Sequence, residues 1–139
     1  MNKLLVCISF FFLLCLVYEN YLAEAKPMDN TPVHPGKAVY DANCLTCHQA
    51  DARGVPGMNP PLVKTEWVLG DKTRLINILL KGLKTPITIN GEQFHNPMPA
   101  QNFLTDQQIA DVLTYIRSNF GNKASAVKAE EVRKLRLIK

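Results

Sequence analysis

The chain has 139 residues, 47% hydrophobic and 20% charged, with 16 Lys and Arg against 12 Asp and Glu. This length suits one domain rather than two. The excess of positive charge lies at the C-terminal end, since residues 36–122 hold 8 basic and 7 acidic residues whereas residues 123–139 hold 6 and 2. The body is nearly neutral, and we expect no nucleic-acid partner.

Residues 1–25 are predicted to form a secretory signal peptide. Lys3 precedes an uncharged apolar run of 15 residues, Leu4–Tyr18, and Ala23-Glu24-Ala25 has the small-x-small pattern of a cleavage site. The run is shorter than the roughly 18 to 20 residues of a membrane-spanning helix. We therefore expect cleavage after residue 25 and export to the periplasm or the outer face of the cytoplasmic membrane, with an uncleaved anchor as the alternative.

Cleavage at that point would remove Cys7 and Cys15, two of the four cysteines. A lipid anchor on Cys15 is not expected, because a small residue should precede a lipidated cysteine and Leu14 is large. The remaining pair, Cys44 and Cys47, would then stand in an oxidising compartment. Attachment of both to a cofactor would leave no free thiol.

Residues 26–35 contain three prolines and are predicted to be an irregular leader. A short helix over residues 36–43 is expected to lead into Cys44-Leu45-Thr46-Cys47-His48, which is a C-x-x-C-H haem-attachment motif. On a helical turn both cysteines lie on one face, where their thiols can add across the two vinyl groups of a haem. The histidine that follows is then carried under the iron as the proximal ligand.

The same motif has two other known uses. Cys44, Cys47 and His48 could supply three zinc ligands, but structural zinc sites usually have a second, well-spaced pair of ligands. Only His34 or His95 is left to complete such a site. A thioredoxin-like redox site requires a βαβ context that the sequence lacks. Both alternatives are weaker than haem.

Residues 49–67 contain five glycines and prolines, so they are predicted to form a loop wrapped on another group. A haem is a good candidate for that group in so small a domain. The segment 59–62 is expected to pass under the haem and to offer a backbone carbonyl to the ring N–H of His48. Such a partner would fix the orientation of the histidine ring.

The second half of the chain shows clear start and stop signals. Asp71 can cap a helix over residues 72–83, and Asn90-Gly91 predicts a hairpin over residues 88–94. After a loop over residues 95–103, the capping box of residues 105–108 begins the last core helix, which Gly121 closes.

A second axial ligand would have to come from a methionine or another histidine. The candidates are Met28, Met58, Met98, His34 and His95. Met58 lies on the loop assigned to the proximal side, and Met28 and His34 lie in the leader. Met98 stands between two prolines that keep the backbone extended, so its thioether can be presented to a metal. We predict Met98 as the ligand, with His95 as the runner-up.

These residues together resemble class I cytochromes c, in particular small bacterial mono-haem domains. The resemblance rests on Gly36, Tyr40, the haem motif and residues 54–62, 67–70, 96–100 and 104–117. It implies an all-α cytochrome c fold wrapped around one covalently bound haem c with its iron, with a short hairpin before the methionine loop. It also implies that the first and last core helices cross, with Gly36 and Tyr40 meeting the last helix near Tyr115.

The same resemblance implies roles for individual residues. His48 and Met98 would be the axial ligands, the Pro60 carbonyl would be the partner of His48, and Trp67 would lie near a haem propionate. The chain departs from the pattern at residues 51–54, where relatives tend to have a second glycine.

The function expected from this sequence is one-electron transfer between redox protein partners. No residue is assigned a catalytic role, because the chemistry would belong to the haem. An alternative is an electron-accepting cytochrome subunit of a membrane-associated dehydrogenase or oxidase complex. A haem sensor or peroxidase-like protein would need an open sixth position. Contact with a membrane is expected only through a partner or an uncleaved signal anchor.

Residues 123–139 are predicted to be a basic C-terminal tail that forms a helix. Glu130 and Glu131 near its start and basic residues toward its end suit the helix macrodipole. Val132, Leu135 and Ile138 would give this helix one narrow apolar stripe, which is expected to pack on the domain or on a partner rather than in a membrane. We expect removal of the tail to leave the haem site unchanged.

Overall fold

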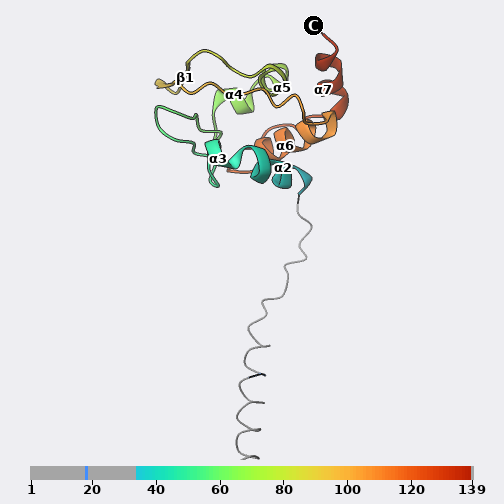
Figure 1. The fold of residues 1–139 in the computed structure, drawn as a ribbon, viewed down its shortest axis with the longest axis horizontal. Helices are drawn as coiled ribbons and strands as arrows, with labels where there is room; N and C mark the ends of the chain where they lie inside the picture. The colour runs from blue at the N-terminus through green and yellow to red at the C-terminus, as the bar shows by residue number, and fades with distance from the viewer. Residues whose placement is uncertain (1–17, 19–33, 139) are drawn as a thin grey trace, which may run out of the picture. The chain divides into compact units, whose positions relative to one another are not determined.

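The computed structural model describes residue 18 and residues 34–138, so the predicted signal peptide and most of the leader lie outside the described residues. The elements follow in the order α2 (Pro35–Asn43), α3 (Leu45–His48), α4 (Glu66–Leu69), α5 (Lys72–Lys81), β1 (Ile87–Ile89), β2 (Glu92–Phe94), α6 (Asp106–Ser118) and α7 (Ala129–Arg136) (Figure 1). Within these residues, no helix is long and apolar enough to cross a membrane. The all-α class with one small hairpin is confirmed.

Helices α2 and α6 cross at close range, as the resemblance implied. A Cβ added to Gly36 would lie 2.0 Å from the Asp111 carbonyl oxygen and 2.6 Å from the Tyr115 Cβ, so only glycine allows this approach. The ring of Tyr40 is buried against Tyr115 and Phe120, at centroid distances of 5.8 and 5.3 Å. This crossing fixes the end of α2, from which the cysteine motif begins.

The longer helices begin at the predicted caps. The Asp71 carboxylate accepts a hydrogen bond from the Thr73 backbone N–H at 2.9 Å. The Thr105 hydroxyl accepts from the Gln108 N–H at 3.1 Å, and the Gln108 side chain accepts from the Thr105 N–H at 2.9 Å. Helix α5 ends two residues earlier than predicted, because Gly82 takes a φ of +74° and leaves the helical region.

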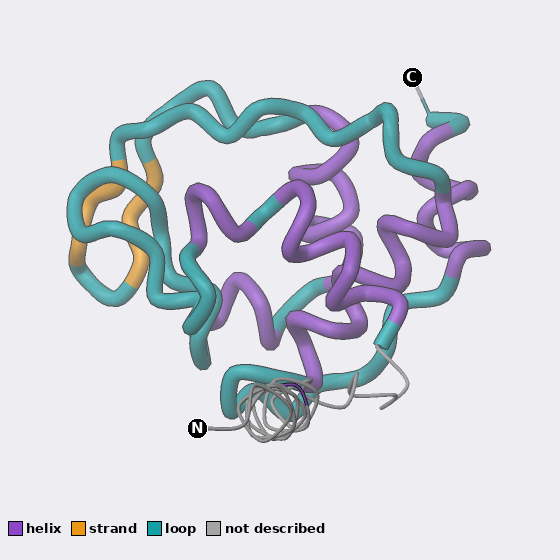
Figure 2. The backbone as a smooth tube through the Cα atoms, turned by 60° about the horizontal axis from the view of Figure 1, so that its bottom comes forward, coloured by secondary structure: helices purple, strands orange, loops and turns teal. Residues whose placement is uncertain are grey.

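The predicted hairpin forms around Asn90 and Gly91. Their φ angles of +52° and +84° are the two left-handed conformations that a tight two-residue turn requires. The strands pair with Ile87 opposite Phe94 and Ile89 opposite Glu92. Figure 2 shows this hairpin at one end of the domain, joined to the helices by long loops.

Helix α7 is not separate from the rest of the domain. It packs on α5 and α6, and the side chains of Val127 and Val132 are 5% and 0% exposed. Residues 34–138 all belong to one compact unit. The apolar stripe is also shorter than predicted, because the helix ends at Arg136 and Ile138 is 60% exposed.

Candidate functional site

A large apolar cavity lies in the middle of the described domain. Its empty volume, including the open mouth, is about 920 Å³. Helices α3, α4, α5 and α6, the hairpin and the loops around them all contribute to the wall. The wall is lined mainly by apolar side chains, which indicates a site for an apolar group.

Both cysteines of the motif line this cavity. Cys44 precedes α3 and Cys47 lies within it, so one helical turn brings both thiols to the same wall. Neither is in a disulfide. Burial, and to a lesser extent the neighbouring Cys47, raises the pKa of the Cys44 thiol to about 11. Two unpaired thiols side by side at a cavity wall fit a group that bonds to both.

His48 lies at the same wall and is 8% exposed. Its Nδ1 is 3.0 Å from the Pro60 carbonyl oxygen. Because a carbonyl only accepts, Nδ1 carries the proton and Nε2 keeps its lone pair. Burial lowers the pKa of His48, and the hydrogen bond to Pro60 opposes that shift in part. The neutral ring, held through one nitrogen, has the other nitrogen available for a metal.

Gly54 makes the approach of the Pro60 carbonyl possible. Its φ is +68°, and an added Cβ would lie 2.2 Å from the Asn59 carbonyl oxygen and 2.7 Å from that of Pro60. Ala52 belongs to the segment 51–54, where relatives were expected to have a second glycine, and it also takes a left-handed φ of +58°. Its side chain is fully buried, so packing holds the loop in a conformation that costs an alanine about 1–3 kcal/mol.

Met98 lines the cavity from the loop of residues 95–104, here called the methionine loop. Its N–H and carbonyl both pair with Leu83, at 2.9 Å each. Gly82 permits this pairing, because a Cβ there would lie 2.5 Å from the Met98 carbonyl oxygen. The role of Gly82 was missed in the sequence. Its only signal was a glycine near the expected end of a helix.

Of the other candidates for the second axial ligand, Met58, His34 and His95 do not line the cavity. Met58 is 49% exposed, and His95 is exposed as well. The His34 Nδ1 accepts a hydrogen bond from the Gly36 N–H at 3.1 Å, where it caps α2. Met28 lies outside the described residues.

The arrangement of these side chains does not favour the alternative of a zinc site. Within the part of the chain that the structure describes, no three His, Cys, Asp or Glu side chains gather closely enough to hold a metal ion.

Trp67 also lines the cavity, and Arg74 covers its ring with the guanidinium carbon 4.6 Å from the centroid. The Arg74 Nη2 donates to the Glu66 carbonyl at 3.1 Å. Its Nε is buried and has no hydrogen-bond partner among the described residues. Arg74 itself does not line the cavity, so it supports Trp67 from outside the wall. Sequence reasoning missed Arg74, whose signal was a cation in the first turn of α5, where the macrodipole disfavours it.

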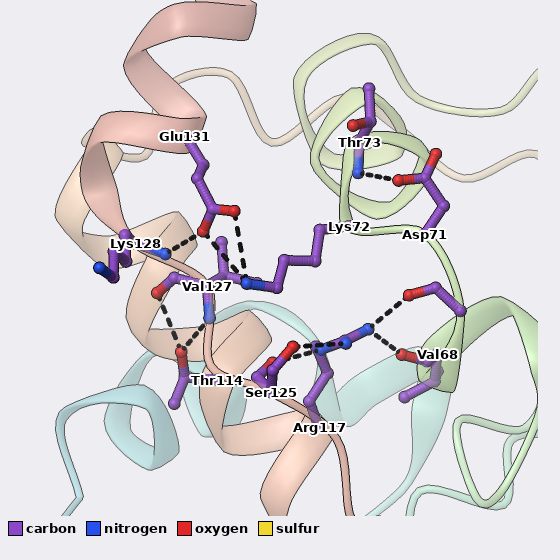
Figure 3. A network of polar contacts seen from close by, with 11 residues as sticks. Val68, Asp71, Lys72, Thr73, Thr114, Arg117, Ser125, Val127, Lys128 and Glu131 are labelled. Carbon is purple, nitrogen blue, oxygen red and sulfur yellow. Dashed lines mark hydrogen bonds and ion pairs between the residues drawn. The ribbon is translucent and has the colours of Figure 1, made fainter.

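A second arginine, Arg117, holds the part of the cavity wall that contains Trp67. Arg117 is 2% exposed, and its Nη1 donates to the carbonyls of Val68 and Gly70 at 2.5 and 3.1 Å. Its Nε donates to the Ser125 carbonyl at 2.8 Å (Figure 3). Burial lowers the pKa of Arg117. This one side chain therefore ties α6 and the segment before α7 to the end of α4, which carries Trp67.

The cavity, the two thiols and a histidine whose Nε2 is available to a metal fit a covalently attached haem. This is the kind of site that such a helical fold forms. The family model for cytochrome c matches residues 33–120. The chain belongs to the cytochrome c family. Its matched residues form a cytochrome c domain, which carries covalently bound haem c with its iron and serves in electron transfer.

Several characterised proteins are similar to this chain. The cytochrome c subunit of a quinone alcohol dehydrogenase from Gluconacetobacter polyoxogenes is 37% identical over 122 residues, which cover 86% of this chain and 26% of that subunit. Cytochrome c-552 of Thermus thermophilus is 38% identical over 111 residues, covering 73% of this chain and 83% of the relative. The gluconate 2-dehydrogenase cytochrome c subunit of Pantoea cypripedii is 37% identical over 105 residues, covering 73% and 24%. The chain thus spans about a quarter of the dehydrogenase subunits that it matches.

Proposed function

We propose that the chain holds one haem c in the cavity described above, linked to Cys44 and Cys47, with His48 and Met98 as its axial ligands. The observation that carries this proposal is that all four side chains line a single cavity although Met98 is 50 residues beyond His48. The haem iron supplies the one-electron chemistry. The chain supplies attachment, orientation and exclusion of water.

Each side chain has a defined task in this proposal. The S–H groups of the two cysteines add across the haem vinyl groups, so that two thioethers form and no atom leaves. His48 is oriented by the Pro60 carbonyl at 3.0 Å. Met98 is held at its backbone by Leu83, and a thioether ligand favours the reduced iron and raises the reduction potential.

The propionates would lie toward Trp67, which lines the cavity. Arg74 stacks on the Trp67 ring although it does not line the cavity itself. Stacking on Trp67 at 4.6 Å limits the orientations that the guanidinium can take. Trp67 thus positions the arginine as well as forming part of the wall.

The proposed setting is outside the cytoplasm, among redox protein partners. The signal-peptide pattern of residues 1–25 supports export, and covalent haem attachment of this kind suits the outer side of the cytoplasmic membrane. Relatives named as cytochrome subunits of dehydrogenases support a dehydrogenase as electron donor, either as a diffusing partner or in one complex. Contact with a membrane would come through that complex or an uncleaved anchor.

Redox titration of the haem-loaded protein tests the proposed function. We expect one reversible one-electron transition, with low-spin, six-coordinate spectra on both sides of it. Carbon monoxide should bind the reduced protein poorly, because Met98 fills the position that it needs. Rapid and tight binding of carbon monoxide would instead favour a ligand sensor or a peroxidase-like protein.

A further inference from the structure

The far end of the methionine loop is held by a residue of α7. The Arg136 Nη1 donates to the Asn102 carbonyl at 2.8 Å, and its Nη2 donates to the Leu104 carbonyl at 2.7 Å. Its Nε donates to the Asp106 carboxylate at 2.7 Å. All three partners lie at least 30 residues earlier in the chain. One planar guanidinium thus grips the loop at two carbonyls and α6 at its first turn.

The two carbonyls that Arg136 binds belong to the residues on either side of Phe103, where the loop meets the cavity wall. Leu104 is 5% exposed and lines the haem cavity, whereas Phe103 is 68% exposed. Nearer Met98, the loop is tied to the α5 side by the Leu83 pairing and by the Gln101 N–H, which donates to the Leu79 carbonyl at 2.6 Å. Beyond Gln101, the loop is held differently. Among the described residues, Arg136 donates the hydrogen bonds that the Asn102 and Leu104 carbonyls accept.

Helix α7, which carries Arg136, is itself well packed on the domain. Val132, one turn before Arg136, is fully buried. The Glu131 carboxylate pairs with the Lys72 ammonium at 3.3 Å and accepts from the Lys128 N–H at 2.7 Å (Figure 3). A side chain on a well-packed helix can restrain a loop that would otherwise open locally at low free-energy cost.

We infer that Arg136 is a positioning residue for the sixth iron ligand: by gripping the carbonyls of Asn102 and Leu104, it keeps the methionine loop closed on the haem. This inference rests on the proposed ligation by Met98. Exchange of Met98 for an outside ligand requires the loop to move away from the iron. Loss of Arg136 makes that movement easier, although Arg136 is far from Met98 in sequence and itself touches no ligand.

The test is titration of the oxidised, haem-loaded protein with imidazole, which competes for the sixth position. Arg136→Ala is compared with the wild type and with Arg133→Ala. Arg133 is an exposed residue of the same helix, and its side chain makes no hydrogen bond or ion pair with residues 34–138. Both variants therefore remove the same charge from α7. The midpoint of denaturant unfolding is measured on the same samples.

We expect Arg136→Ala to bind imidazole at least about tenfold more tightly, since even one lost charge-assisted hydrogen bond is worth about that factor. Arg133→Ala should match the wild type. Unchanged imidazole binding in Arg136→Ala, even with a lower unfolding midpoint, would reduce Arg136 to a stabilising contact and overturn the inference. An equal effect in Arg133→Ala would also overturn it. If the wild type lacks the thioether band before imidazole is added, the Met98 assignment itself fails, and the inference fails with it.

Discussion

Hydrogen bonds to backbone groups hold both proposed axial ligands in position. His48 is oriented by the carbonyl of Pro60, and Met98 is fixed by two hydrogen bonds to the backbone of Leu83. In each case a glycine provides the space, since an added Cβ at Gly54 or Gly82 would come within 2.5 Å of a backbone carbonyl oxygen. The positions of both proposed ligands therefore depend on two glycines, Gly54 and Gly82, as well as on the ligands themselves.

Replacing Met98 with alanine removes the proposed sixth ligand. The weak near-infrared-edge absorption of thioether-bound ferric haem should disappear. The reduction potential should fall by tenths of a volt, within the roughly 0.8 V that axial ligands span. Optical spectroscopy and redox titration check both effects. His95→Ala is the matched control, because that exposed side chain does not line the cavity. Loss of the band in His95→Ala alone would transfer the assignment to His95.

A second residue-scale prediction separates backbone strain from collision with the ligand loop. Gly82→Ala and Gly91→Ala both place an alanine at positive φ, +74° and +84°. Only the first would push a Cβ into the Met98 carbonyl, since nothing lies within 4 Å of the Gly91 position. Each should lose about 1–3 kcal/mol of unfolding free energy to strain. Gly82→Ala alone should also weaken the thioether band, and an intact band would show that the loop adapts.

Helices α3, α4, α5 and α6 line the cofactor site, while α7 packs outside it. Arg117 ties α6 to the end of α4 and to Ser125, and Arg136 ties α7 to the methionine loop. Removal of residues 123–139 would therefore strip partners from Arg117 and expose buried apolar surface. We now expect truncation at residue 122 to destabilise the haem domain, contrary to the expectation from sequence.

Packing of α7 can be measured with a single substitution. Val132→Ala should lower the free energy of unfolding by roughly 1–3 kcal/mol, because it removes fully buried methyl groups and leaves a small cavity. Leu137→Ala, at a side chain 77% exposed, should change it little. Denaturant titration of both variants provides the comparison. Equal and small effects would mean that α7 does not pack on the domain in solution.

The start of α7 should respond to acid. The Lys128 N–H and then the Lys72 ammonium lower the pKa of Glu131 below its usual value near 4.5. Its contribution to stability is therefore complete above that value and is lost as the pH falls through the lowered, folded-state pKa. Glu131→Gln should cost at most about 1 kcal/mol at neutral pH, since the side chain is 39% exposed and screened.

The same variant should equal the wild type at the acid end of the range, where both side chains are neutral. Denaturant unfolding at a series of pH values measures this difference. Glu130→Gln is the control, because Glu130 is an exposed neighbour in the same turn and forms no ion pair in the described structure. A loss that persists undiminished in acid would mean that the charge of Glu131 is not its source.

Across the whole molecule, local sequence signals predicted local structure well. The cap at Asp71, the capping box at Thr105 and the Asn90-Gly91 turn each depend on residues within a few positions of one another. The cysteine motif and the proline-flanked methionine likewise directed attention to one cavity. The contacts that sequence reasoning missed are long-range. Arg117 meets Val68 across 49 positions and Arg136 meets Leu104 across 32, and no periodic pattern reports such a pairing.

Covalent attachment of haem to Cys44 and Cys47 is the central claim, and denaturing electrophoresis with a haem stain tests it most directly. The protein is produced with export and the haem-attachment machinery, denatured in acid and extracted with organic solvent. The wild-type polypeptide should keep its haem, and the double variant Cys44→Ala/Cys47→Ala, with His48 intact, should release it. Free extraction of haem from the wild type, or haem retained on the double variant, would contradict the account.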